Sequence, residues 1–472
     1  MIRMAIQVVL VDEVGGGREV HEIVRIDCGR LCPETLGLSL AEAKAITGGI
    51  QQVLAGAQVI EWQEDQRACP DCGRRRSLKG HHRIVYQTPF GTLRLDSERL
   101  RACRCAVPPR HSLSPLAELL GERNSPELPY LETKFASLAS YGLTVRLMGE
   151  LLPFERPIGV ERVRRHLFRV GETHEAELAS APTSIAPDDP IGPHNTPPDG
   201  PLFVGIDGGY VRGREQDWFE VIAGKSLVSF HRDGRMPDPS RRCFAFVQTV
   251  DDRPRARLVD TLRQQGMQPQ QQVVFLSDGA DTLRRLQQNI APEAEHVLDW
   301  FHIIMRLTVL GKMIKGAWTD AATIEARTAA LDRIKWLLWH GNALDAIVDI
   351  ECLADDVDGD LEENPTAASL RKLASTLGEL ATYITNNVGH IVNYGERFRA
   401  GERISTGFVE LAINQIVDKR CDKRQSMRWT PRGVHLLLQA RTRVLNGDLN
   451  QLIRRRYPAF RSPQQTSIAP AL

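Results

Sequence analysis

Three β-type runs follow one another in the C-terminal half of the chain: FVGIDGGYVRGR (203–214), WFEVIAGKSLVSF (218–230) and RCFAFVQTV (242–250). Turn-forming residues separate them, which predicts an antiparallel start to a mixed sheet. Beyond them the pattern alternates between helix and strand: ARLVDTLRQQG (256–266) is helical, VVFLSDGAD (273–281) is an apolar strand ending in acids, TLRRLQQN (282–289) is helical, and HVLDWFHI (296–303) is strand-like.

A meander followed by strand-helix-strand alternation is the order of a ribonuclease-H-like domain, so we expect a multidomain α/β protein with that catalytic fold. The domains predicted along the chain are an N-terminal α+β segment (1–62), a zinc ribbon (63–112), a helix-turn-helix (113–175), a proline-rich linker (176–200), the ribonuclease-H-like domain (201–303 and 394–430), an all-helical insertion (304–393) and a basic tail (431–472).

Composition narrows the class of protein. The chain has 472 residues, of which 42% are hydrophobic and 25% charged, so it is neither disordered nor a small disulfide scaffold. No run approaches the roughly 20 apolar residues that a membrane helix needs, and the N-terminus lacks a secretory signal. We expect a cytoplasmic protein, associated with the nucleoid when bound to DNA, with no membrane partner.

Charge is unevenly distributed, although the net charge is only +1. Segment 67–110 has 11 basic and 3 acidic residues, and segment 395–456 has 14 and 6, so each is +8. The stretch 345–363 holds nine acids and no Lys or Arg, which hides the basic regions in the total. The alternative is that these are solvated faces; two basic regions predict a polyanion bound at more than one place.

Acidic residues follow the apolar runs. Asp207 follows FVGI and Asp278 follows VVFLS, so both are expected at one edge of the sheet, with Asp281 as a competitor for the second position. Glu410 lies one turn into a helix whose expected cap is Ser405 or Thr406. Three such carboxylates would hold two Mg²⁺ or Mn²⁺ ions about 4 Å apart for phosphodiester chemistry. Singly, each is more often a turn or cap residue.

An aspartate–histidine pair and a pair of tryptophans each allow two interpretations. Asp299 and His302 would share a face on a helical turn but not on a strand, and they either support the metal residues or form a buried, satisfied pair. Trp336 and Trp339 lie in the insertion at helical spacing, which favours core packing over stacking on an unpaired base.

Two cysteine pairs predict one structural zinc. Cys69 and Cys72 form CPDCG, Cys103 and Cys105 form CRC, and a β-hairpin turning at Pro89–Gly91 joins the pairs. His81 or His82 could replace one thiolate, and Cys28 with Cys32 is a weaker competing pair. We expect the isolated cysteines Cys243, Cys352 and Cys421 in the core.

Basic residues on two helical segments are candidates for contact with double-stranded DNA. The last helix of the expected helix-turn-helix presents Arg162, Arg164, Arg165 and Arg169. The alternative is a plain three-helix connector, which would have the same sequence pattern. A second group lies around RQSMRWTPRGVH and comprises Lys419, Arg420, Lys423, Arg424, Arg428, Trp429 and Arg432.

Several long motifs in order resemble the ISKra family of bacterial insertion-sequence transposases. They are FVGIDGGYVR, FLSDGADTLRRLQ, AEHVLDWFHIIMRL, IKWLLWHGN, NYGERFRAGERISTGFVE and MRWTPRGVHLLLQ, and the resemblance covers most of the chain. It implies a DDE transposase with a helical insertion between the second and third carboxylates, which by position are Asp278 and Glu410, with Asp207 as the first. The Asp299–His302 pair is similar to a motif of Mutator-type transposases.

The resemblance implies a function and its partners. The enzyme would bind the terminal repeats of its element, cleave DNA and join the 3′-hydroxyl to target DNA, as a dimer or larger assembly. The alternatives are a structure-specific nuclease of the same fold that cleaves without joining, and a domesticated zinc-dependent DNA-binding protein without catalysis.

Overall fold

The chain folds into two compact units in a computed structural model. One comprises residues 1–170 and 447–472, and the other residues 171–446. The structure describes residues 2–11, 16–105, 110–181, 200–215, 217–227, 241–269, 271–290, 292–405, 407, 413–421 and 428–461. None of the helices in these ranges is long and apolar enough to cross a membrane.

The first unit begins with a β-hairpin and a long helix. Strands β1 (Ile2–Val11) and β2 (Arg18–Cys28) pair antiparallel, a short turn of 3-10 helix (Pro33–Thr35) follows, and α1 spans Leu40–Gln66. Ser39 and Glu42 cap α1 reciprocally, each accepting a hydrogen bond from the other's backbone N–H. This reciprocal capping box fixes the start of the helix.

Behind α1 lies a small three-stranded sheet. Strands β3 (Leu78–Thr88) and β4 (Gly91–Arg101) form the predicted hairpin, and β5 (Ser112–Leu113) pairs with β4. The remaining helices of this unit are α2 (Pro115–Leu119), α3 (Glu127–Leu138), α4 (Tyr141–Leu151), the first half of α5 (Val160–Ser180) and α16 (Leu449–Arg456). Four helices, α2, α3, α4 and the start of α5, thus occupy the segment 113–175 expected to be a helix-turn-helix.

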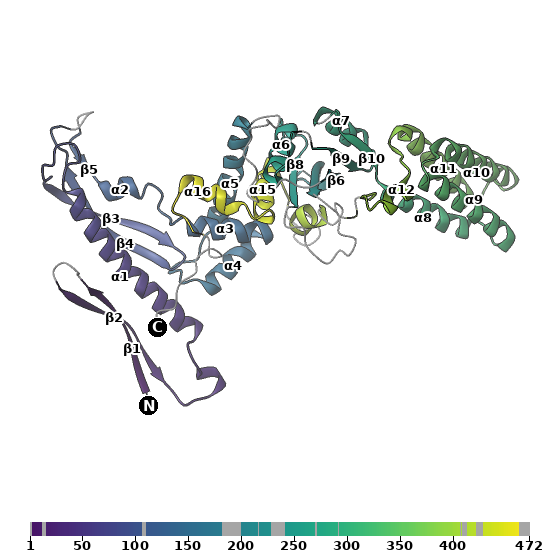
Figure 1. The fold of residues 1–472 in the computed structure, drawn as a ribbon. Helices are drawn as coiled ribbons and strands as arrows, with labels where there is room; N and C mark the ends of the chain where they lie inside the picture. The colour runs from purple at the N-terminus through teal and green to yellow at the C-terminus, as the bar shows by residue number, and fades with distance from the viewer. Residues whose placement is uncertain are drawn as a thin grey trace. The chain divides into compact units, whose positions relative to one another are not determined.

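A five-stranded mixed sheet is the centre of the second unit (Figure 1). Its order is β10-β9-β6-β7-β8, in which β6, β7 and β8 are antiparallel while β9 and β10 run parallel to β6. The strands are β6 (Leu202–Arg212), β7 (Trp218–Leu227), β8 (Arg242–Val247), β9 (Val273–Ser277) and β10 (Glu295–Leu298). Helices α6 (Pro254–Gln265) and α7 (Asp281–Ile290) connect the strands in the predicted order.

The expected insertion is a helical bundle that shares a core with the sheet. Its helices are α8 (Trp300–Ala317), α9 (Ala321–Trp339), α10 (Ala343–Glu363) and α11 (Ala368–Asn386), followed by a short 3-10 turn, η2 (Val388–His390), and by α12 (Tyr394–Arg399). Buried side chains of the bundle, such as Leu377, pack in one cluster with Val274 and Leu298 of the sheet. Because that cluster is continuous, the bundle and the sheet form one folding unit.

Three expectations differ from the structure. The strand at 296–303 ends at Leu298, and α8 begins at Trp300 with Asp299 as its cap. The segment from 431 is no tail at its start, because α15 (Pro431–Leu445) is a buried helix packed on β8. The apolar side chains of its GVHLLLQ run are buried, which favours a packed helix over an exposed tail. Cys352 is exposed on α10, whereas Cys243 and Cys421 are buried as predicted.

After α12, the described residues 413–421 are helical. They form a π-helical turn, η3 (Asn414–Asp418), and α14 (Lys419–Cys421). The expected helix at 405–420 is thus described only in its last part, and Thr406 and Glu410 lie outside the described residues.

Candidate metal centre

Two aspartates meet at the edge of the five-stranded sheet. Asp207 lies in β6 just beyond the residues that pair with β9, and Asp278 directly follows β9. Because β6 and β9 are parallel neighbours, both carboxylates point to the same end of the sheet. Ligand atoms of Asp207, Asp278 and His302 all lie within 4.8 Å of one another. The structure therefore brings together the first two predicted carboxylates; the third, Glu410, is outside the described residues.

His302 enters the site from the first turn of α8. Asp299, fully buried, accepts a hydrogen bond from the Phe301 backbone N–H at 2.9 Å and one from His302 Nδ1 at 2.7 Å. The same carboxylate thus starts the helix and fixes the imidazole ring. Asp299 caps α8 and His302 lies in its first turn, so the two share a face, and the His302 ring lies beside the two carboxylates.

Protonation in the site follows from burial and crowding. Burial raises the pKa of Asp207 to about 6, with the charges of Asp278 and Asp299 adding to the rise and His302 opposing it. Burial lowers the pKa of His302, but its hydrogen bond to Asp299 and the nearby carboxylates outweigh this and leave the pKa raised. The site therefore holds protons more firmly than free side chains would, as expected where negative charges converge.

A fourth carboxylate lies close by on β7. Burial and the charge of Asp278 raise the pKa of Glu220. Its Oε1 occupies the space where a side chain at position 208 would begin, 2.9 Å from an ideal Cβ. Glycine at 208 in the IDGGY motif therefore makes room for Glu220 beside the metal edge.

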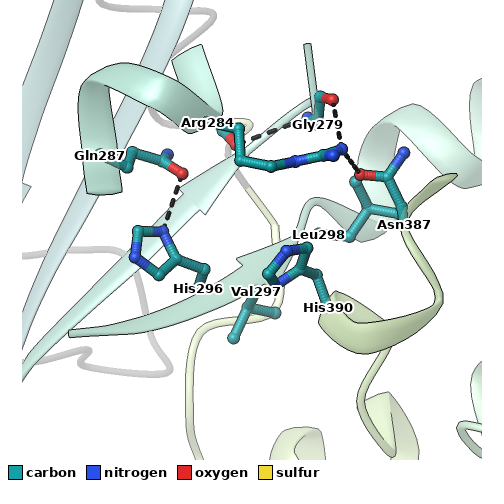
Figure 2. Close-up of a pocket in the computed structure, with 9 residues that line it drawn as sticks. Gly279, Arg284, Gln287, His296, Val297, Leu298, Asn387 and His390 are labelled. Atoms are coloured by element: carbon teal, nitrogen blue, oxygen red, sulfur yellow. Dashed lines mark hydrogen bonds between the residues drawn. The ribbon is translucent and has the colours of Figure 1, made fainter. Parts of the chain in front are cut away.

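The turn that carries Asp278 is held by the end of α11. Tyr383 donates its hydroxyl to the Asp278 carbonyl at 2.9 Å, and the buried Asn387 packs against Gly279. Arg284 donates to the Gly279 carbonyl at 2.9 Å and also to the Asn387 side chain (Figure 2). Gly279 has φ +78°, and a Cβ there would lie 2.4 Å from Asn387 Oδ1, so only glycine fits.

Beneath this turn is a cavity of about 10 Å³, enough for about one water molecule. Figure 2 shows His296, Gln287 and His390 around it, with the Gln287 side-chain oxygen accepting from His296 at 2.9 Å. The cavity is too small for a substrate, and its polar lining belongs to the support of the Asp278 turn.

The donor set suits a divalent metal. Two carboxylates on adjacent parallel strands and an imidazole oriented by a buried aspartate offer hard oxygen ligands and one nitrogen. The pKa values of Asp207 and His302 are raised, and a bound cation would take the place of the protons that these two groups hold. The group fits Mg²⁺ or Mn²⁺, which prefer oxygen, and the imidazole extends its range towards softer ions.

Four cysteines form a second cluster, in the first unit. The Sγ atoms of Cys69 and Cys105 are 3.5 Å apart, those of Cys72 and Cys103 are 3.3 Å apart, and all four lie within 4.8 Å of one another. A zinc tetrahedron with 2.3 Å bonds has edges of about 3.8 Å, so the cluster can hold zinc. His81 instead pairs with Asp96 at 2.8 Å, and neither His81 nor His82 is among the clustered side chains.

Local backbone builds this cluster. Cys69 N–H donates to the Arg74 carbonyl and Gly73 N–H to the Cys69 carbonyl, closing a tight turn around CPDCG. A backbone hydrogen bond from Asp71 lowers the pKa of the Cys69 thiol to about 6, so this sulfur is prepared as a thiolate ligand. Cys103 and Cys105 follow directly after β4.

The arginines on α5 are mostly engaged within the protein. Arg162 faces the buried Glu132, which also contacts His166, and Arg164 pairs with Glu161 on its own helix. Arg169 is exposed and pairs with Glu122 at 2.9 Å, while Arg165 is exposed. Of these four, Arg165 and Arg169 are the best placed for phosphates.

In the second basic group, burial separates two kinds of residue. Arg420 and Trp429 lie in the interior, with the guanidinium 5.2 Å from the indole ring centre and the indole N–H donating to the Cys421 carbonyl. Their predicted phosphate contacts are not available there. Lys419, Arg428 and Arg432 are exposed, and Lys423 and Arg424 lie outside the described residues.

Sequence reasoning missed the supports of Asp278. Tyr383 and Asn387 follow Asp278 by more than a hundred residues, and no local pattern links them. His302 had a signal, since an aspartate three residues before a histidine at the start of an apolar run is a cap followed by one helical turn.

The chain was compared with protein families and with curated proteins. No protein-family model matches the chain, and no curated protein is significantly similar to it.

Proposed function

We propose that this chain is a DNA transposase of the DDE type, with a ribonuclease-H-like catalytic domain. The observation that carries the proposal is the meeting of Asp207 and Asp278 at one edge of a sheet in which an antiparallel meander is followed by two parallel strands. Where the structure describes them, the motifs that resemble ISKra transposases include β6, β9 and β10 and helices α8, α9, α12 and α15.

The residues divide the work of phosphodiester cleavage. Asp207 and Asp278 would hold the metal. Asp299 fixes His302 beside them, where a protonated imidazole would offset the negative charge of the carboxylates. Bound Mg²⁺ or Mn²⁺ would activate the attacking water or 3′-hydroxyl and stabilise the leaving oxygen. Glu410 is the third carboxylate that the resemblance implies. The cysteine cluster and α5 would contact the element ends, in an assembly of at least two copies.

A cleavage and joining assay tests the proposal. DNA carrying the inverted repeats that flank the element is incubated with Mg²⁺, target DNA and the wild-type chain, Asp278→Asn or Asp252→Asn. Asp252 is a matched control because its side chain is 83% exposed. We expect wild type and Asp252→Asn to cut and join, and Asp278→Asn to bind the ends without doing either.

The other outcomes select the alternatives. Cleavage without joining, regardless of sequence, would identify a nuclease of the same fold. Binding of the ends by all three proteins, with no cleavage, would identify a DNA-binding protein and overturn the proposed chemistry.

A further inference from the structure

A groove runs between α8 and α11, starting at the turn that carries Asp278. Its first part is polar, has a volume of about 590 Å³ and is lined by Gly279, Arg284, Arg306, Thr382, Tyr383 and Asn386, among others. Its second part has a volume of about 270 Å³ and is lined mainly by apolar side chains, including Met305, Val309 and Leu380. Arg306 and Glu379 line both parts, so the two are continuous.

One face of α8 leads from the metal centre into this groove. His302, Arg306 and Val309 follow one another at spacings of four and three residues, which places them in a row along the helix. From His302 to Arg306 the rise is about 6 Å, which one or two nucleotides of a strand, at about 3.4 Å each, would span. A strand leaving the carboxylates along α8 therefore meets a cation and then an apolar surface.

The side chains suit the two parts of a nucleotide. Arg306 is exposed, with its guanidinium 4.1 Å from the centre of the Tyr383 ring, and stacking on that ring presets its position. Met305 is 47% exposed and Val309 46% exposed, so both present apolar surface to the groove beside the Arg306 cation. Phosphate fits the first part of the groove and a base fits the second.

We propose that this groove binds an unpaired stretch of the DNA strand next to the scissile phosphate, with a backbone phosphate at Arg306 and a base against Met305 and Val309. The inference rests on the proposed function for the identity of the strand. Glu379 also lines the groove, and its negative charge would repel the phosphate. Neutralising Glu379 should therefore raise the affinity of the groove for DNA.

Binding is measured without catalysis, as the fluorescence anisotropy of a labelled oligothymidylate in buffer without Mg²⁺ or Mn²⁺. We expect Arg306→Glu to weaken binding several-fold, and Arg306→Ala to lower the slope of log affinity against log salt by about 0.7. Glu379→Gln should tighten binding. Lys312→Glu is the matched control, because Lys312 is exposed on α8 and does not line the groove.

A second probe separates the base from the phosphate. An oligonucleotide of abasic units should bind wild type more weakly than oligothymidylate, and Val309→Ser should narrow that difference, whereas Arg306→Glu should weaken both probes. Circular dichroism verifies that each variant is folded. Equal losses in Arg306→Glu and Lys312→Glu, or no preference of wild type for bases, would overturn the proposal. Because no cleavage is measured, the groove can fail while the metal centre stands, or the reverse.

Discussion

Asp207 is the side chain through which pH acts most directly on the metal centre. Its pKa is raised from 3.8 to about 6 in the fold, so it favours the folded protein below about pH 4 and loses that contribution as the pH rises through 6. Asp207→Asn should therefore stabilise the metal-free protein at neutral pH, by on the order of 2 kcal/mol. Thermal melts at about pH 5 and pH 7.5, in buffer without Mg²⁺ or Mn²⁺, measure this.

The same thermal melts, repeated with added Mn²⁺, test metal binding by Asp207. Mn²⁺ should raise the melting temperature of the wild type and of Asp252→Asn at neutral pH, and should not raise that of Asp207→Asn. A wild-type melting temperature that stays level from pH 5 to 7.5, while Asp207→Asn gains nothing, would show that burial does not raise the pKa of Asp207 in the folded protein.

Tyr383 positions Asp278 through the backbone. Tyr383→Phe removes one hydrogen bond at 2.9 Å to the Asp278 carbonyl, which is worth about 1 kcal/mol. We expect Mn²⁺ affinity to fall by roughly fivefold, because 1.4 kcal/mol corresponds to tenfold. Calorimetric titration measures it. The matched control is Tyr457→Phe, which loses a 2.8 Å hydrogen bond to Glu122 in the other unit; equal losses of Mn²⁺ affinity in both variants would refute the positioning role.

Among the elements, the β3–β4 hairpin and the turn at Cys69–Gly73 depend on the cysteine cluster. Cys69→Ser should prevent zinc binding at the cluster and loosen this region, because a structural metal contributes directly to folding. Zinc content by mass spectrometry of the native protein, together with amide exchange over β3 and β4, provides the measurement. Cys352→Ser, at an exposed cysteine outside the cluster, should leave both unchanged. Full zinc content in Cys69→Ser would assign the metal elsewhere.

Elements with strong local patterns could be predicted, and contacts across the chain could not. The succession of β6 to β10 along the chain and the two cysteine pairs have signals within a few residues. HVLDWFHI was ambiguous because a short apolar run fits strand and helix equally, and the aspartate cap decides between them. Tyr383 contacts Asp278 across 105 residues of sequence, so no local pattern could predict this hydrogen bond.

For the molecule as a whole, local charge counts overstate the charge available to DNA. Segment 395–456 is +8 by sequence, but Arg420, Arg441 and Arg443 are at most 6% exposed, and Arg397 pairs with Glu295 and Glu402. The three buried arginines cannot contact a phosphate backbone, and Arg397 is paired within the protein. DNA affinity should still fall steeply with salt, with a smaller slope than the sequence count suggests.

Arg428 and Arg420 test this separation within one basic segment. Arg428 is exposed, so Arg428→Ala should lower the salt slope of duplex binding by about 0.9 and leave the melting temperature unchanged. Arg420 is fully buried against Trp429, so Arg420→Ala should keep the slope and lose about 1–3 kcal/mol of stability. Binding titrations at several salt concentrations, with thermal melts of each variant, give both quantities. Affinity that is flat from low to moderate salt in the wild type would remove phosphate contact from the function of this segment, and the same slope change in both variants would mean that Arg420 reaches DNA after all.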